Sequence, residues 1–181
     1  MPIEPYRGIL PTIDPTAYVH PSAIIIGDVH IGAYSSIWPG VVIRGDVNFV
    51  RIGARSNIQD GSILHVTRPT EENPNGIPLL IEDEVTIGHQ VSLHACHLRS
   101  RSMVGIGAIV LDGVVVEEEA MVGAGSLVAP GKRVASGELW LGSPAKPVRL
   151  LDERARQAIA ATTENYVRLA TEFRQALQTS G

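Results

Sequence analysis

Residues 98–134 read LRSRSMVGIGAIVLDGVVVEEEAMVGAGSLVAPGKRV, and an aliphatic residue stands at every sixth position. These positions are Leu98, Val104, Val110, Val116, Val122, Val128 and Val134. A period of six fits neither the two-residue alternation of a strand nor the period of about 3.6 of a helix. It is typical of a hexapeptide parallel β-helix, in which each coil of about 18 residues stacks on the previous one and buries the aliphatic position.

The same period extends toward the N-terminus with three changes of phase. The earlier aliphatic positions are Ile25, Ile31, Ile37 and Ile43, then Ile52, Ile58 and Leu64, then Ile81, Ile87 and Leu93. The largest change, eleven residues, falls between Leu64 and Ile81, where the chain reads TRPTEENPNGIP at positions 67–78. This polar, proline-rich segment predicts a loop that projects from one corner of the repeat.

Two histidines fall on equivalent positions once that insertion is removed. Leu64 and Leu93 are then 29 − 11 = 18 residues apart, so His65 and His94 should lie on successive coils, about 4.8 Å from each other. A third histidine, His89, lies five residues before His94 and around a corner, too far to join them within one chain. Three imidazoles with one open position are the ligand set of a catalytic zinc. We therefore expect a homotrimer whose metal sites lie at subunit interfaces, with His89 supplied by a neighbour.

Composition excludes several classes of function. The chain has 181 residues, a formal net charge of −4 and 4% aromatic residues, which argues against nucleic-acid binding. No apolar stretch is long enough for a membrane span, and MPIEPYRGIL is not a secretory signal. The single cysteine, Cys96, fits a reducing compartment, so a cytoplasmic location is expected, although an organelle after removal of a transit peptide is an alternative.

The C-terminal segment differs from the repeat. LGSPAKPVR should end the prism, and from Asp152 onward apolar residues recur every three to four positions in a sequence rich in Ala, Leu, Glu and Arg. This pattern predicts one amphipathic helix that lies back along the prism. We divide the chain into a hexapeptide-repeat domain, residues 1–147, and a helical appendage, residues 148–181.

Three motifs resemble those of the γ-class carbonic anhydrases, including bacterial hexapeptide-repeat relatives. They are RGD at Arg44–Asp46, SNIQDGSILH at Ser56–His65 and IGHQVSLHAC at Ile87–Cys96. The resemblance covers nearly the whole chain and implies an all-β fold, a left-handed parallel β-helix of hexapeptide repeats with a C-terminal α-helix. It also implies a homotrimer with zinc held by His65, His89 and His94.

The resemblance further assigns roles to individual residues, with CO2 and bicarbonate as substrate and product and zinc hydroxide as the attacking group. Gln59 would orient the hydroxide with Asn57 beside it, and Tyr166 resembles a helix tyrosine that reaches toward the site. An interface charge network would comprise Arg44, Asp46 and Asp60. Val47 stands where the prototype of the γ class has a glutamate that transfers protons, so slow hydration of CO2 is expected.

Other readings fit part of the pattern. Imidazole also suits Fe²⁺, Co²⁺ and Ni²⁺. Hexapeptide acyltransferases share the prism and a turn like GSPAK at residues 142–146, although they use one histidine as general base. A metal-dependent hydrolase of coenzyme A thioesters and a non-catalytic assembly subunit are the remaining alternatives. His20, His30 and His97 are read as surface or corner residues, Glu71 and Glu72 as a solvated loop, and Cys96 as a buried small side chain.

Overall fold

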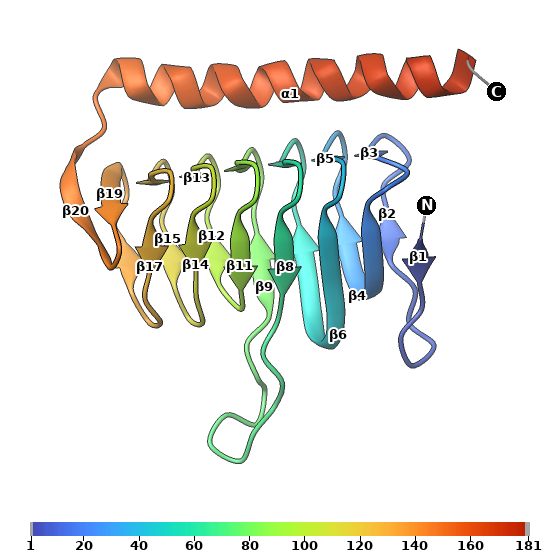
Figure 1. Ribbon diagram of the computed structural model, residues 1–181, viewed down its shortest axis with the longest axis horizontal. Helices are drawn as coiled ribbons and strands as arrows, with labels where there is room; N and C mark the ends of the chain where they lie inside the picture. Colours follow the sequence, from blue (N-terminus) through green and yellow to red (C-terminus); the bar gives the residue numbers. More distant parts are fainter. Residues whose placement is uncertain (1, 180–181) are drawn as a thin grey trace.

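The computed structural model describes residues 2–179, with side chains through residue 176, and shows a three-sided parallel β-helix covered by one long helix (Figure 1). The first face contains the start of β4 (Ile24–Ile31) and of β6 (Val42–Ile52), then β8 (Ile63–His65), β11 (Ser92–His94), β14 (Ile109–Val110) and β17 (Leu127–Val128). The second contains the ends of β4 and β6, then β9 (Leu79–Ile81), β12 (His97–Leu98), β15 (Val115–Val116) and β18 (Arg133–Val134).

The third face is built from β3 (Tyr18–Val19), β5 (Ser36–Ile37), β7 (Asn57–Ile58), β10 (Thr86–Ile87), β13 (Met103–Val104), β16 (Met121–Val122) and β19 (Glu138–Gly142). At the N-terminus, β1 (Ile3–Glu4) and β2 (Thr12–Ile13) both pair with β4. The final strand, β20 (Ala145–Leu150), turns back antiparallel to β19 and ends the array. The division proposed between residues 147 and 148 falls within β20. The predicted fold, a hexapeptide-repeat parallel β-helix with a C-terminal helix, is confirmed.

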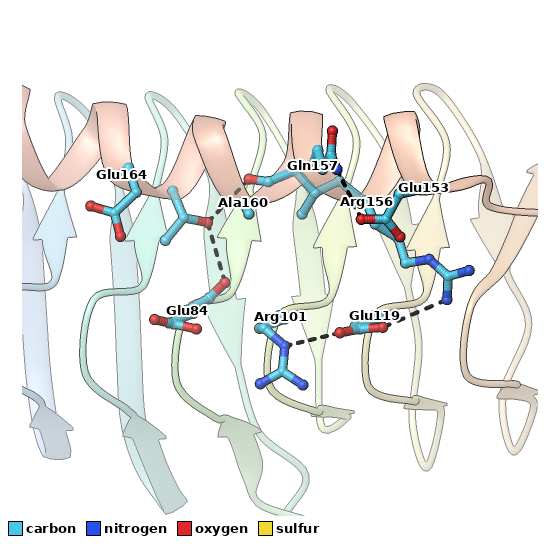
Figure 2. Close-up of a pocket in the computed structure, with 10 residues that line it drawn as sticks. Glu84, Arg101, Glu119, Glu153, Arg156, Gln157, Ala160 and Glu164 are labelled. Atoms are coloured by element: carbon cyan, nitrogen blue, oxygen red, sulfur yellow. Dashed lines mark hydrogen bonds and ion pairs between the residues drawn. The ribbon is translucent and has the colours of Figure 1, made fainter.

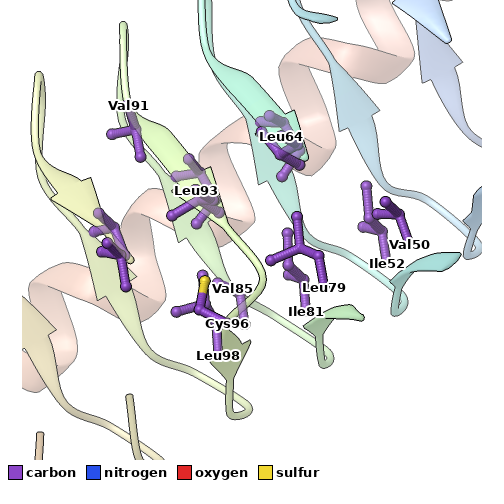
Figure 3. Packing of buried hydrophobic residues seen from close by; sticks show 14 of the residues in the cluster. Val50, Ile52, Leu64, Leu79, Ile81, Val85, Val91, Leu93, Cys96 and Leu98 are labelled. Atoms are coloured by element: carbon purple, nitrogen blue, oxygen red, sulfur yellow. The ribbon is translucent and has the colours of Figure 1, made fainter. Parts of the chain in front are cut away.

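The aliphatic period forms the core. Every position named above for the six-residue repeat is buried, from Ile25 to Val134. Figure 3 shows part of this core, in which Leu64, Leu93 and Cys96 point into the prism. Each coil buries its side chains only against adjacent coils. The pairing of strands therefore determines which residues of neighbouring coils lie opposite one another.

The insertion at residues 67–78 projects from the prism between β8 and β9, as expected (Figure 1). Thr67 and Ile77 form an antiparallel bridge at its base. The projection leaves the stacking of neighbouring coils intact, because β9 resumes pairing with both β6 and β12.

The terminal helix α1 (Glu153–Thr179) begins where the sequence predicts. Asp152 caps it, since Asp152 Oδ1 accepts a hydrogen bond from the Ala155 N–H at 2.8 Å. The helix runs the length of the prism along β10, β7, β5 and β3 of the third face (Figure 1). Its contacts include an aromatic cluster in which Tyr166 packs edge-on against Trp38 with ring centroids 5.5 Å apart. No helix in the described part of the chain is long and apolar enough to span a membrane.

Candidate metal centre

His65 and His94 lie side by side at the end of the first face. They are direct partners in the β8–β11 pairing, which confirms the register deduced from the 18-residue coil. His65 Nδ1 and His94 Nε2 face each other at 3.2 Å. A tetrahedral zinc with bonds of about 2.0–2.1 Å separates two ligand nitrogens by about 3.4 Å, so this pair already has the spacing of two zinc ligands.

A carboxylate holds the outer nitrogen of each ring. His65 Nε2 lies 3.0 Å from Asp46 Oδ1, and His94 Nδ1 lies 2.6 Å from Asp112 Oδ1. Carboxylates of this kind fix the tautomer and orientation of metal-binding imidazoles. When each outer nitrogen donates its proton, two lone pairs are left facing one another, an arrangement that a cation between them stabilises. The residues present therefore fit a metal ion.

Asp46 is the more enclosed of the two carboxylates, with its side chain 12% exposed. Partial burial opposes ionisation, but hydrogen bonds from His65, Arg44 and the Val47 N–H outweigh it and lower the pKa of Asp46. Arg44 also forms an ion pair with Asp46 from the same strand, β6. The structure thus joins the RGD motif directly to His65, and Asp46 stays ionised as an acceptor for the ring N–H.

Asp112 and Thr67 lie outside the three motifs that predict the site. Asp112 follows His94 by 18 residues, one full coil, so the stacking rule could have identified it. Thr67 donates a hydrogen bond to Asp112 Oδ2. Partial burial raises the pKa of Asp112, but the bonds from Thr67 and His94 outweigh this and lower it overall.

His89 lies at the opposite corner of the same face, in the turn between β10 and β11. Its Nδ1 is 2.9 Å from Asp60 Oδ2, so its Nε2 is the free nitrogen. Asp60 lies 29 residues earlier, the same separation as His65 from His94, which means that it occupies the equivalent position one coil below. The three predicted ligands therefore have the same arrangement. One ring nitrogen contacts a carboxylate, and the other ring nitrogen is available to a metal ion.

Asn57 and Gln59 belong to the His89 corner. Both are buried, and Gln59 Nε2 donates to Asn57 Oδ1 at 2.9 Å. Tyr166 reaches this region from α1. Burial, together with the charge of Asp60, raises the pKa of the Tyr166 hydroxyl, which is consequently protonated at neutral pH.

One chain therefore presents two half-sites. The His65 half-site contains Arg44, Asp46, His65, His94 and Asp112; the His89 half-site contains Asn57, Gln59, Asp60 and His89. Among the described residues of a single chain, no three His, Cys, Asp or Glu side chains are grouped so as to hold a metal ion. Within the described part of one chain, His89 is therefore not grouped with His65 and His94.

Cys96 follows His94 closely but lies in the core, 2% exposed. Burial raises the pKa of its thiol strongly, with a smaller contribution from the charge of Asp112. The thiol is therefore not a thiolate at neutral pH and is a poor zinc ligand. We expect Cys96 to resist a disulfide reagent at pH 8 in the native protein and to react once in denaturant. Fast labelling of the native protein, followed by absorbance, would contradict this placement.

One pocket lies away from these histidines. It has a volume of about 490 Å³ and lies between α1 and the corner of the prism that carries Glu84, Arg101 and Glu119 (Figure 2). Its charged groups pair with one another, as Arg101 does with Glu119 at 3.1 Å. A smaller pocket of about 240 Å³ adjoins Asp46 and Val47. We place the site at the histidines, because the chemistry of the donor atoms and not the size of the hollow decides where a metal binds.

The repeat and its stacked coils define this chain as a hexapeptide-repeat protein with two histidine clusters at opposite corners of one face. The family model for the bacterial transferase hexapeptide, six repeats, matches residues 11–45. The chain is 48% identical to Protein YrdA of Escherichia coli over 171 residues, 94% of this chain and 93% of that protein. It is 46% identical to a carbonic anhydrase of Geobacillus kaustophilus over 165 residues, 91% of this chain and 87% of the relative.

Gamma carbonic anhydrase 2 of Arabidopsis thaliana is 48% identical over 160 residues, 88% of this chain and 57% of that protein. Among solved structures, a hexapeptide transferase family protein of Anaplasma phagocytophilum superposes with a TM-score of 0.88 at 42% identity, covering 95% of this chain and 98% of the other. The chain belongs to the γ-class carbonic anhydrase family of hexapeptide-repeat proteins.

Proposed function

We propose that this protein is a zinc-dependent hydratase of CO2 that acts as a homotrimer. The observation that carries the proposal is the His65–His94 pair, whose facing nitrogens are 3.2 Å apart while a carboxylate holds each outer nitrogen. His89 of a neighbouring chain, held by its own Asp60, would be the third ligand. Zinc in such a site lowers the pKa of a bound water to about 7 and supplies hydroxide for addition to CO2.

The surface between the two half-sites supports the trimer. Outward-facing residues of the first face form a register-matched ladder of Ile24, Val42, Ile63, Ser92, Ile109 and Leu127. Ile63 is 52% exposed and Ile109 is 37% exposed in the single chain. An exposed ridge of this kind, aliphatic at every position except Ser92, is typical of an interface. It runs along the face between the His65 and His89 corners, so burying it against another chain would bring unlike half-sites together.

The protein residues have separate tasks in this scheme. Asp46, Asp112 and Asp60 orient the three imidazoles and maintain their tautomers. Gln59 Oε1 makes no hydrogen bond with any described residue and is not among the buried polar atoms that lack a partner, so it is open to accept a hydrogen bond from a proton of the attacking water. Val47, half-buried against the core, offers no group for removing that proton, so turnover should be slow for this class.

The test is stopped-flow CO2 hydration with zinc measured on the same sample, for the native protein, His94→Ala and His97→Ala. We expect about one zinc per chain and hydration in the native protein, both lost in His94→Ala because two ligands do not retain the metal. His97→Ala is the matched control, since that imidazole pairs with Glu82 at 2.8 Å on another face. It should keep both properties.

Zinc content unaffected by His94→Ala would contradict the site. Zinc without hydration, accompanied by hydrolysis of acetyl-coenzyme A, would indicate that the same metal centre hydrolyses thioesters. Acetyl transfer without zinc would favour the acyltransferase reading, and zinc with neither activity would favour the assembly subunit.

A further inference from the structure

A buried chain of hydrogen bonds links helix α1 to Gln59. Gln59 Nε2 donates to Asn57 Oδ1 at 2.9 Å, and Asn57 Nδ2 donates to Thr86 Oγ1 at 2.9 Å. Thr86 Oγ1 lies 3.2 Å from Thr163 Oγ1, on the helix. All four residues are at most 5% exposed. Asn57 and Gln59 belong to the motif at residues 56–65, whereas neither threonine lies in any of the three motifs.

The chain ends on acceptors that cannot donate. Thr163 Oγ1 lies 3.3 Å from the Glu84 carbonyl oxygen and 3.4 Å from the Ile159 carbonyl oxygen. Figure 2 shows Glu84 on the prism beneath the helix. A carbonyl only accepts, so the Thr163 hydroxyl can bond either oxygen only by donating its single proton to it. The bond between the two hydroxyls is then donated by Thr86 and accepted by Thr163.

The direction of each remaining hydrogen bond, from Thr86 to Gln59, follows from this first one. Thr86 donates to Thr163, so its lone pairs face Asn57, and Asn57 must turn its NH2 group toward Thr86 and its oxygen toward Gln59. Gln59 then satisfies that oxygen with its own NH2 group, which leaves Oε1 as the outward acceptor. An amide orientation of this kind is set by the network, since the amide group has nearly the same shape when reversed.

We propose that Thr163 and Thr86 are positioning residues that fix the polarity of the Asn57–Gln59 amide pair, so that Gln59 presents an oxygen and not an NH2 group to the reacting water. The assignment of the reacting water rests on the proposed function, whereas the amide orientation does not. Without the Thr163 hydroxyl, Thr86 has no acceptor in the helix and can donate to Asn57 instead. The pair then reverses, and Gln59 turns its NH2 group outward.

The test compares Thr163→Val, Thr163→Ser and Thr162→Val in the full-length protein. Thr163→Val keeps the side-chain shape and removes the hydroxyl, and Thr163→Ser restores it. Thr162→Val is the matched control, because Thr162 Oγ1 also bonds a carbonyl four residues back, that of Ala158 at 2.8 Å, but does not touch the chain. Solvent exchange of the Gln59 side-chain NH2 hydrogens is followed by ¹⁵N NMR, with the signal assigned by its loss in Gln59→Met.

We expect exchange of the Gln59 NH2 group to accelerate at least about tenfold in Thr163→Val, because the group leaves its buried acceptor and faces solvent. Zinc content should stay unchanged, kcat for CO2 should fall about tenfold and KM should change less than about twofold. Thr163→Ser should restore the native values, and Thr162→Val should not depart from them. If loss of the hydroxyl merely destabilised the helix, kcat would fall in both Thr163→Val and Thr162→Val. Exchange of the Gln59 NH2 group would then remain as in the native protein.

Unchanged Gln59 exchange in Thr163→Val would overturn the proposal, whatever the activity. Accelerated exchange in a protein whose native form does not hydrate CO2 would uphold the polarity chain and contradict the proposed function instead. Thr86→Val is the second variant, and its expected effect on the Gln59 signal is the same because it removes the link next to Asn57.

Discussion

Two inactive variants, His89→Ala and His94→Ala, are expected to regain zinc and CO2 hydration when their chains are mixed in one trimer. Alone, each has no complete site, and hydration should fall roughly a thousandfold or more. In mixed trimers, His65 and His94 from the His89→Ala chain can meet His89 from the other. Random association of equal amounts restores about a quarter of the sites, since each site draws its pair from one chain and its third ligand from another.

The control mixture is His65→Ala with His94→Ala. Both lesions lie in the same half-site, where the two rings pair within one chain across β8 and β11. No combination of those chains assembles an intact pair, so this mixture should remain inactive. Recovery here, or no recovery in the first mixture once chain exchange is shown by native mass spectrometry, would be incompatible with a site divided between chains in this way.

Gly27→Ala is expected to lower the stability of the prism strongly. Gly27 has a φ of 78°, a conformation that disfavours L residues, and an added Cβ would overlap the Gly45 carbonyl oxygen on the neighbouring coil. Gly45 sits between Arg44 and Asp46, so relief of the overlap would also displace the carboxylate that holds His65. We expect a loss of about 3 kcal/mol beyond the cost of the backbone conformation, measured by urea unfolding at fixed chain concentration.

Gly107→Ala separates the two causes. Gly107 has a similar φ of 66°, but no atom lies within 4 Å of the added Cβ. It should therefore lose only about 1 kcal/mol, the cost of placing alanine in the left-handed region. If the two variants unfold at the same urea concentration, close approach between coils is not what requires glycine at position 27.

The sequence alone predicts the 18-residue coil and the residues that it buries and pairs. Burial of Ile25 through Val134 and the pairing of His65 with His94 follow from one rule, that positions one coil apart stack. The rule works here because strand pairing in a β-helix joins residues at a constant separation, so an insertion such as residues 67–78 projects outward without disturbing the register. Asp112 obeys the same rule and could have been found with it.

Tertiary structure decided what the period does not encode. Asp46 reaches His65 because the RGD segment lengthens β6 past the ordinary repeat. Thr163 meets Thr86 across 77 residues, at a contact between a helix and a prism. The position of a helix on a sheet depends on how their side chains pack, which has no fixed spacing along the chain. The sequence therefore determined the register and the side chains that stack on it, whereas the contacts of Asp46 and Thr163 depend on an irregular strand and on the packing of α1.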